Sequence, residues 1–125
     1  MTHGTTIKHL VCRDKCRFYF CLYIDLHNKS CGIKLRICEA GEQGKGYGEE
    51  ALHGFLNYLF TTYQLHRIYV EILVGNILAK ELYEKVGFKV IGIERDIWLD
   101  SQGIYRSGIL IDLIRDDYLR EKYNL

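Results

Sequence analysis

The stretch Ile33–Tyr63, IKLRICEAGEQGKGYGEEALHGFLNYLFTTY, places a strand pattern, a glycine-rich loop and a helix pattern in direct succession. From Ile33 to Ile37 apolar residues alternate with basic ones, which predicts a half-buried strand. From Ala51 to Tyr63 apolar residues recur at helical spacing, which predicts one amphipathic helix. Between them, the segment 39–48 contains four glycines. We therefore expect a loop that leads directly from a strand into the start of a helix.

The loop sequence Gln43-Gly44-Lys45-Gly46-Tyr47-Gly48 has the composition of a phosphate-binding turn. Backbone N–H groups at a helix N-terminus are unpaired and carry partial positive charge. Glycines let an anion approach such N–H groups closely, and Lys45 adds a mobile positive charge. The alternative is a flexible strand-to-helix turn, but three alternating glycines beside a Gln and a Lys favour phosphate binding. The glycine spacing fits neither a Walker loop nor a dinucleotide-binding fold.

The rest of the chain predicts further strands and a second helix. We expect strands over the ranges Ile7–Val11, Arg17–Leu26, Arg67–Leu73, Lys89–Leu99 and Tyr105–Ile114. The first two long strands, Arg17–Leu26 and the one that contains Ile33–Ile37, are close enough in sequence to form an antiparallel hairpin. Because Arg67–Leu73 barely alternates, we expect it to be buried on both faces. The predicted class is α+β (α/β), with a mixed, mostly antiparallel sheet and two main helices.

The second helix has clear start and stop signals. Asn76 is its expected N-cap, and Gly87 fits the left-handed position that ends a helix. Its apolar residues are Ile77, Leu78, Leu82, Tyr83 and Val86. The polar tail Arg115–Leu125 is expected to form a short final helix.

Composition limits the class of protein. The 125 residues are 48% hydrophobic and 26% charged, which is typical of one globular domain, residues 1–125, and excludes disorder. We find no apolar run of membrane-helix length and no leader pattern, so we expect a cytoplasmic protein with no membrane partner. Residues 1–38 carry a net charge of +5 (seven Lys/Arg against two Asp/Glu), but without an Arg-rich run a solvated basic edge is favoured over nucleic-acid binding.

The cysteines and histidines do not predict a metal site. The five cysteines form no C-x-x-C pair, and no H-E-x-x-H occurs. Free thiols in a reducing compartment are the simplest interpretation.

Two motifs together resemble a known family. The segment Gln43–Gly48 resembles the Q/R-x-x-G-x-G/A acetyl-CoA loop of the GCN5-related N-acetyltransferase (GNAT) family. Asn76 and the segment Ala79–Phe88 (AKELYEKVGF) resemble that family's N-x-x-A-x-x-L-Y-E-K-x-G-F segment. The nearest branches acetylate ribosomal-protein N-termini or polyamines. The resemblance covers residues 17–118 and implies acetyl transfer from acetyl-CoA, as co-substrate, to a primary amine.

The resemblance also implies roles for individual residues in holding acetyl-CoA. The amides of Gly44, Gly46 and Gly48 are expected to hold the pyrophosphate, with Gln43, Lys45 and Tyr47 in the same loop. The strand end Leu35-Arg36-Ile37-Cys38 is expected to pair its backbone with the pantetheine arm. A backbone N–H near Ile37 or Cys38 is expected to polarise the thioester carbonyl, and Asn76 to contact the cofactor.

Three residues are candidates for the proton transfers. The resemblance implies that Tyr83 protonates the departing CoA thiolate, whereas its apolar helix face alone would make it a core residue. Glu39, at the end of the strand before the loop, and Glu71, a charged residue in an apolar strand, are alternative bases. For Glu39 a solvated loop acid is the competing interpretation. Cys38 as a nucleophile is disfavoured, because no His lies nearby in sequence.

The sequence also departs from the family pattern. The family has a strand and two helices before the hairpin, and these helices build much of the acceptor site, but only sixteen residues precede Arg17. A shortened, non-catalytic CoA-binding or interaction domain is therefore the alternative function. Since lost covering elements would expose apolar surface, we also expect a homodimer.

Overall fold

The computed structural model describes residues 4–13, 16–37 and 47–124. The elements along the chain are β1 (Gly4–Arg13), β2 (Cys16–Asp25), β3 (Ser30–Ile37), α1 (Tyr47–Thr61), β4 (Arg67–Leu73), α2 (Ile77–Val86), β5 (Lys89–Leu99), β6 (Tyr105–Ile114) and α3 (Arg115–Lys122). This order confirms the predicted succession of strands and helices. The predicted bounds of β4, β5 and β6 agree with the structure, whereas β1 is longer than the segment Ile7–Val11 expected for it.

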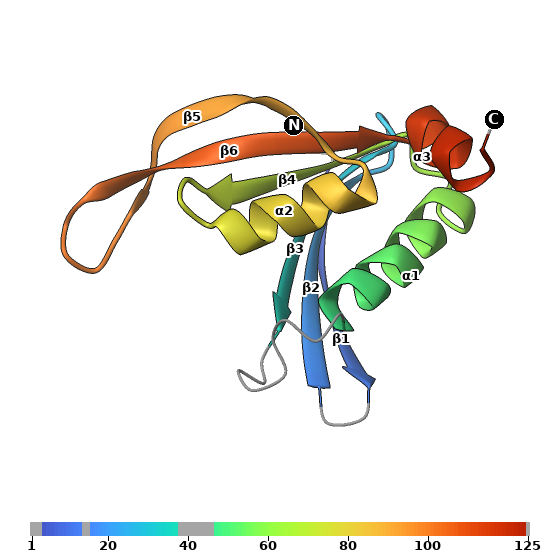
Figure 1. Cartoon of the computed structure of the whole chain (residues 1–125), viewed down its shortest axis with the longest axis horizontal. Coiled ribbons are helices and arrows are strands. Elements are labelled where there is room, and N and C mark those ends of the chain that lie inside the picture. The colour runs from blue at the N-terminus through green and yellow to red at the C-terminus, as the bar shows by residue number, and fades with distance from the viewer. Residues whose placement is uncertain (1–3, 14–15, 38–46, 125) are drawn as a thin grey trace.

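The six strands form one mixed sheet in the order β1-β2-β3-β4-β6-β5. All neighbouring pairs are antiparallel except β3 and β4, which are parallel. In Figure 1 the strands β1–β3 run down the view, whereas β4, β6 and β5 run across it. The parallel pair is therefore the junction between two halves of the sheet that run in different directions.

The hydrophobic core lies between the sheet and the helices α1 and α2, which cover the same face (Figure 1). From α1 the buried side chains are Leu52, Leu56, Leu59 and Phe60. Their spacing places them on one stripe of the helix, as the sequence predicts. The ring of Tyr118, from α3, stacks on Phe60 with centroids 4.9 Å apart, so α3 extends the same layer. Burial of each such large side chain contributes roughly 1.5–3 kcal/mol to folding.

The ends of α2 confirm both predicted caps. The Asn76 side-chain Oδ1 accepts a hydrogen bond from the Ala79 N–H at 3.2 Å, as an N-cap does. Gly87 adopts φ +118°, the left-handed conformation that favours glycine, and its N–H donates to the Glu84 carbonyl. The residues at both ends of α2 thus determine where this helix begins and ends.

The prediction that β4 is buried on both faces is wrong. Ile68, Val70 and Ile72 are buried against the helices, but the alternate residues from Arg67 to Leu73 are half-buried or exposed. The apolar character of Tyr69 and Leu73 concealed this alternation. One face of β4 is therefore core, and the other is open among the residues that the structure describes.

Two of the five apolar residues of α2 lie outside the core. Tyr83 and Val86 are buried and Leu82 is half-buried, whereas Ile77 and Leu78 are 64% and 79% exposed. Both lie in the first turn of α2, beyond the edge of the helix-covered core. They leave an apolar surface at the start of this helix.

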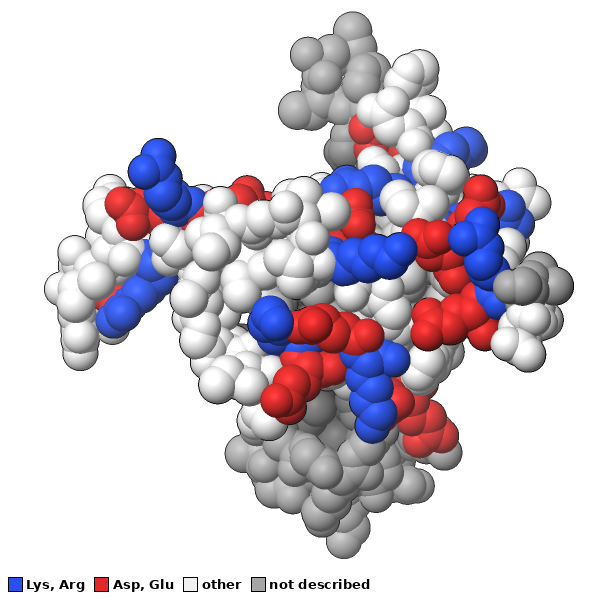
Figure 2. All heavy atoms as spheres, turned by 45° about the horizontal axis from the view of Figure 1, so that its top comes forward, with Lys and Arg blue, Asp and Glu red and all other residues white. Residues whose placement is uncertain are grey.

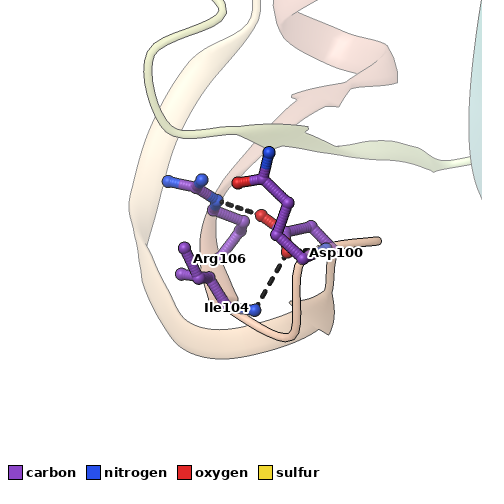
Figure 3. Close-up of polar contacts among 4 residues, drawn as sticks. Asp100, Ile104 and Arg106 are labelled. Carbon is purple, nitrogen blue, oxygen red and sulfur yellow. Dashed lines mark hydrogen bonds and ion pairs between the residues drawn. The ribbon is translucent and has the colours of Figure 1, made fainter.

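The β5–β6 hairpin extends away from the helices at the left of Figure 1. At its tip, the Asp100 carboxylate accepts hydrogen bonds from the N–H groups of Gln102 and Ile104, each at 2.9 Å. A third comes from Arg106 Nε at 2.9 Å (Figure 3). These three hydrogen bonds close the turn between β5 and β6.

The described surface carries both signs of charge. Figure 2 shows Lys and Arg side chains interspersed with Asp and Glu rather than gathered in a patch of one sign. Several are paired, as in the Lys85–Glu49 contact at 3.1 Å. None of the helices in the described part of the chain is long and apolar enough to cross a membrane.

Candidate functional site

The candidate site lies where β3 and β4 separate. Their parallel pairing covers three residue pairs and ends at Gly32 with Tyr69. Beyond this point β3 continues to Ile37 and β4 continues to Leu73, with no further register pairing between them in the described strands. The backbone of β3 is therefore without a strand partner on this side, which leaves room for an extended group between the two strands.

A pocket of about 320 Å³ lies at this point of divergence. Its lining residues come from four strands and are Tyr23, Gly32, Ile33, Tyr69, Glu71 and Trp98. Tyr69 and Glu71 belong to the face of β4 that the helices leave open, whereas Ile33 belongs to the buried core. Since residues of both faces line the pocket, it reaches from the open face into the gap between the strands.

Gly32 allows the ring of Tyr69 to lie against β3. A Cβ atom on Gly32 would lie 2.7 Å from Tyr69 Cε2 and 3.0 Å from its hydroxyl oxygen, closer than real Cβ atoms come. A glycine inside a strand often marks such a close approach. The Tyr69 ring therefore packs directly against the backbone of Gly32.

Arg67 lies over the ring of Tyr69 and is itself paired with Asp112. Arg67 Cζ lies 5.0 Å from the centroid of the Tyr69 ring, and Arg67 Nε donates to Asp112 Oδ2 at 2.9 Å. Burial is the main cause that raises the pKa of the Tyr69 phenol above 10.0, with the nearby Cys31 and Glu71 adding to the effect. The Tyr69 side chain is thus a neutral phenol at physiological pH.

An irregularity in the β5 edge strand brings Trp98 to the pocket. The register with β6 shifts between Glu94 and Trp98, so β5 has extra residues there. Such bulges re-aim side chains. The Trp98 ring lies over Gly108, where an added Cβ would be 3.1 Å from a ring carbon. An added Cβ would lie still closer to Ile97 Cδ1, at 2.6 Å, so the absence of a side chain at position 108 makes room for both Ile97 and Trp98.

Of the two alternative bases, the structure describes one. Glu71 is exposed on the open face of β4 and lines the pocket. Glu39 lies outside the described residues. A carboxylate beside the gap between β3 and β4 is in a position to exchange a proton with a group that enters it.

The structure does not describe the side chains of most residues that are predicted to contact acetyl-CoA. Gln43, Gly44, Lys45, Gly46 and Cys38 lie outside the described residues. Tyr47 and Gly48 are the first two residues of α1, and Leu35 and Ile37 belong to the part of β3 that pairs with β2 but not with β4. Leu35 and Ile37 lie on the expected strand, whereas Tyr47 and Gly48, expected in the loop, begin the helix α1. The contact of all four residues with a cofactor stays a prediction.

Asn76 and Tyr83 occupy different surroundings on α2. Asn76 caps the helix at its exposed start. Tyr83 is 4% exposed and meets the Phe88 ring edge-to-face, with centroids 5.2 Å apart. Both interpretations of Tyr83, core residue and proton donor, are compatible with this position, so its catalytic role stays a prediction.

Five of the six residues that line the pocket were not among the site residues predicted from the sequence: Tyr23, Gly32, Ile33, Tyr69 and Trp98. The available signals were weak. Gly32 interrupts a strand, and Tyr69 shares the alternate positions of β4 with Glu71. Neither signal shows that residues from four strands meet at one point, because that depends on the sheet order. No group of His, Cys, Asp and Glu in the described part of the chain is arranged to hold a metal ion.

Comparison with protein families gives one match. Residues 11–89 match the model of the acetyltransferase (GNAT) domain. This range contains β2–β4, both helices beside the gap and the glycine loop.

The curated relatives share only part of their length with this chain. The spermidine N(1)-acetyltransferase of Vibrio cholerae is 44% identical over 46 residues, which are 37% of this chain and 27% of that protein. The spermidine N(1)-acetyltransferase of Escherichia coli K12 is 31% identical over 80 residues, 63% of this chain and 42% of that protein. The match thus spans less than half of either relative.

Solved structures share the fold over a larger part of the chain. A chimera of the spermidine N-acetyltransferase SpeG from Vibrio cholerae and hSSAT superposes with a TM-score of 0.73 at 25% identity. The superposition covers 83% of this chain and 70% of the chimera. The expected mixed sheet with its covering helices is therefore confirmed.

Proposed function

We propose that this chain, which belongs to the GNAT acetyltransferase family, transfers an acetyl group from acetyl-CoA to a primary amine. The observation that carries the proposal is the separation of β3 from β4 after only three residue pairs. It leaves an unpaired strand edge beside a pocket that contains a carboxylate. A shortened, non-catalytic CoA-binding or interaction domain is the alternative that the experiments below test.

The unpaired edge of β3 fits the arm of acetyl-CoA. A pantetheine chain contains amides, so it can pair with strand backbone as an added strand does. In this proposal Leu35 and Ile37 pair with the arm, and the loop Gln43–Gly48 holds the pyrophosphate at the start of α1. Asn76 adds a contact from the start of α2.

The proposed reaction is direct attack. The amine nitrogen bonds to the acetyl carbon, the C–S bond breaks, and the thiolate takes a proton from the Tyr83 hydroxyl. A backbone N–H near Ile37 or Cys38 stabilises the oxyanion that develops. An alkylamine with a pKa near ~10.4 costs on the order of 4–5 kcal/mol to deprotonate at pH 7. Glu71, which lines the pocket, is the base that this geometry supports, and Glu39 is the second candidate.

The acceptor class and the assembly belong to the same proposal. The relatives' names describe spermidine acetyltransferases, so a polyamine, a protein N-terminus or another small amine is the proposed acceptor. We also propose that residues 1–125 act as one unit, without a metal, in the cytoplasm, as a homodimer. Exposed apolar residues on β5 and β6 support the dimer.

Titration calorimetry with acetyl-CoA tests the cofactor site. Gly46→Glu places a negative charge and a side chain in the proposed phosphate loop, so it should abolish binding. Gly54→Glu is the matched control, because position 54 of α1 is exposed and open, with no atom within 4 Å of an added Cβ. No heat from the wild-type chain with acetyl-CoA, or equal affinity of the two variants, contradicts the proposal.

Turnover separates the enzyme from the non-catalytic alternative. Thiol release from acetyl-CoA is measured with a panel of primary amines. Tyr83→Phe should lower turnover while acetyl-CoA affinity survives, and Tyr58→Phe, on the exposed side of α1, should change neither. Absence of thiol release with every amine would establish the non-catalytic alternative.

A further inference from the structure

We infer that Ser107 of β6 is a positioning residue for the pocket. Its hydroxyl holds the irregular segment of β5 in the conformation that places Trp98 at the pocket, and Trp98 contacts the acceptor amine there. The contact with the amine rests on the proposed function. The control of Trp98 by Ser107 does not.

Two extra residues in β5 set the position of Trp98 along the sheet. Glu94 pairs with Gly108, and Trp98 pairs with Arg106, so β5 advances four residues where β6 advances two. Regular pairing would put Asp96 opposite Arg106 and would carry Trp98 roughly 7 Å toward the tip of the hairpin. The extra residues therefore keep Trp98 on the part of the sheet where the pocket lies.

The extra residues adopt a conformation that needs support. Asp96 has φ +53°, and of the four non-glycine residues with positive φ in the described part of the chain it is the one inside a strand. This left-handed conformation is unfavourable for a residue with a side chain. The Asp96 N–H donates to Ser107 Oγ at 3.1 Å. The hydroxyl thus takes the place of the ladder partner that an extra residue in a strand lacks.

The backbone of Ser107 has a separate role. Its carbonyl oxygen accepts a hydrogen bond from the Val74 N–H at 3.0 Å, directly beyond the last pair between β4 and β6. Val74 lies two residues before Asn76, the N-cap of α2. Removal of the hydroxyl alone leaves this carbonyl in place. It should therefore affect Trp98 and spare the start of α2, where the proposed cofactor contact lies.

The neighbouring Gly108 makes room for the side chains of the irregular segment. A Cβ atom at this position would lie 2.6 Å from Ile97 Cδ1 and 3.1 Å from a ring carbon of Trp98. A side chain at position 108 would therefore force Ile97 to shift. Ser107 holds the backbone of the segment, and Gly108 leaves space for the side chains that it presents.

The position of Trp98 matters for the acceptor because Trp98 and Glu71, the proposed base, line the same pocket. In the proposed reaction the amine enters this pocket to reach the acetyl group. Aromatic side chains supply large contact areas in binding sites. The indole is therefore the surface against which the acceptor packs, and Ser107 acts on the acceptor through Trp98.

Trp98 reports on its own position, because it is the only tryptophan in the sequence. Acrylamide quenching of its fluorescence is measured on the full chain without ligand. In Ser107→Ala the loss of the hydrogen bond should let the segment open, so the quenching constant should rise by about twofold. Ser107→Thr keeps a hydroxyl and should behave like the wild type. Ser101→Ala, which removes an exposed hydroxyl from the turn of the same hairpin, should also match the wild type.

Either of two results overturns the role of the hydroxyl. One is a wild-type quenching constant in Ser107→Ala, shown to be folded by circular dichroism. The other is a rise in Ser107→Thr equal to that in Ser107→Ala, because the hydroxyl would then not be the group that holds the segment.

A second pair of variants tests the conformation of residue 96 without touching Ser107. The Asp96 side chain is exposed, so its replacement acts through the backbone. Asp96→Val introduces a β-branched residue, which strongly disfavours positive φ, and should raise the quenching constant as Ser107→Ala does. Asp96→Asn removes the same charge but tolerates this φ, so it should match the wild type. Equal constants in the two variants contradict the inference.

Kinetic constants test the contact with the acceptor. With an amine that the chain acetylates, Ser107→Ala should raise the KM for the amine by about fivefold and leave the affinity for acetyl-CoA unchanged. Trp98→Leu removes the ring itself and should raise this KM at least as much. Ser101→Ala should change neither quantity. If Ser107→Ala weakens acetyl-CoA binding as much as it raises the KM for the amine, Ser107 is a merely structural residue and the inference is overturned.

The outcomes separate this inference from the proposed function. If no amine is acetylated, the proposed function fails, and the quenching experiments still decide whether Ser107 positions Trp98. If amines are acetylated and neither Ser107→Ala nor Trp98→Leu changes the KM for the amine, the acetyltransferase stands and the contact of Trp98 with the acceptor is overturned.

Discussion

The thiol of Cys31 lies next to the pocket but is chemically inert. It is fully buried on the core face of β3, and its Sγ donates to the Gly32 carbonyl oxygen at 3.4 Å. Burial raises the pKa of this thiol from 9.0 to about 12, although a hydrogen bond from the Tyr23 backbone acts in the other direction. Thiolate is the reactive form. Cys31 is therefore a core residue rather than a nucleophile.

The raised pKa predicts an alkaline loss of stability. Between pH 9.0 and about 12 the unfolded chain has released the Cys31 proton and the folded chain retains it. The unfolded state then binds fewer protons, so stability falls as pH rises, by roughly 1.4 kcal/mol per pH unit from this group. Urea unfolding of the wild type and of Cys31→Ala should show this extra slope above pH 9.0 only in the wild type. Parallel pH profiles would contradict the assignment.

At the scale of elements, the N-cap of α2 offers a test of two roles for Asn76. Asn76→Ala removes the acceptor for the Ala79 N–H and should cost about 1 kcal/mol of unfolding free energy. Asn76→Asp keeps a side-chain oxygen at the cap, so stability should be retained. It replaces the amide with a carboxylate, however, so it should weaken acetyl-CoA binding if Asn76 contacts the cofactor. Urea unfolding and titration calorimetry measure the two effects. Full affinity in Asn76→Asp would leave Asn76 as a cap alone.

The tip of the β5–β6 hairpin depends on one carboxylate. Hydrogen bonds, first from the Ile104 N–H and then from Arg106 and Gln102, lower the pKa of Asp100 below its usual 3.8. The stabilisation is therefore present at pH values above the unfolded pKa and is lost as pH falls through the folded pKa. Asp100→Ala should speed amide exchange at Gln102 and Ile104 at neutral pH, whereas Ser101→Ala in the same turn should not. Unchanged exchange in Asp100→Ala would show that the turn closes without this acceptor.

The bounds of the helices and strands were easier to predict from the sequence than which of their faces is buried. Alternation, helical spacing and the caps Asn76 and Gly87 are local signals, so the bounds of β4–β6 and both ends of α2 followed from the sequence. Which face of β4 is covered depends on where α1 and α2 pack. The apolar residues Tyr69 and Leu73 therefore looked like core and are not. Likewise, the apolar residues Ile77 and Leu78 are exposed, because α2 packs on the sheet through its other residues.

At the scale of the whole molecule, the candidate pocket depends on the order of the strands in the sheet. The glycine loop and the Asn76 segment were recognisable because each is contiguous in sequence. The pocket was not, because Tyr23, Tyr69 and Trp98 come from strands that become neighbours only through the order β2-β3-β4-β6-β5. Parallel pairing of β3 with β4 requires the crossover through α1, and this pairing ends after three residue pairs, which leaves the gap. Local patterns thus locate the proposed phosphate-binding loop, and only the assembled sheet shows the pocket.

The arrangement of the sheet also leaves an open edge. Strand β5 ends the strand order, so its outer side has no strand partner in the described chain. Ile91 and Ile93 on this strand are 55% and 67% exposed. An exposed, apolar edge strand is a template for pairing with another chain. We therefore expect the homodimer to form along β5.

A lysine on the edge should prevent this pairing, since a charge on an edge strand is expensive to bury in a sheet. In sedimentation velocity the wild type should behave as a dimer of the 14.7 kDa chain, and Ile93→Lys as a monomer. Leu78→Lys makes the same change at the more exposed start of α2 and should remain dimeric. A wild-type monomer excludes self-association. If Leu78→Lys is monomeric and Ile93→Lys is dimeric, the chains associate through the start of α2 rather than along β5.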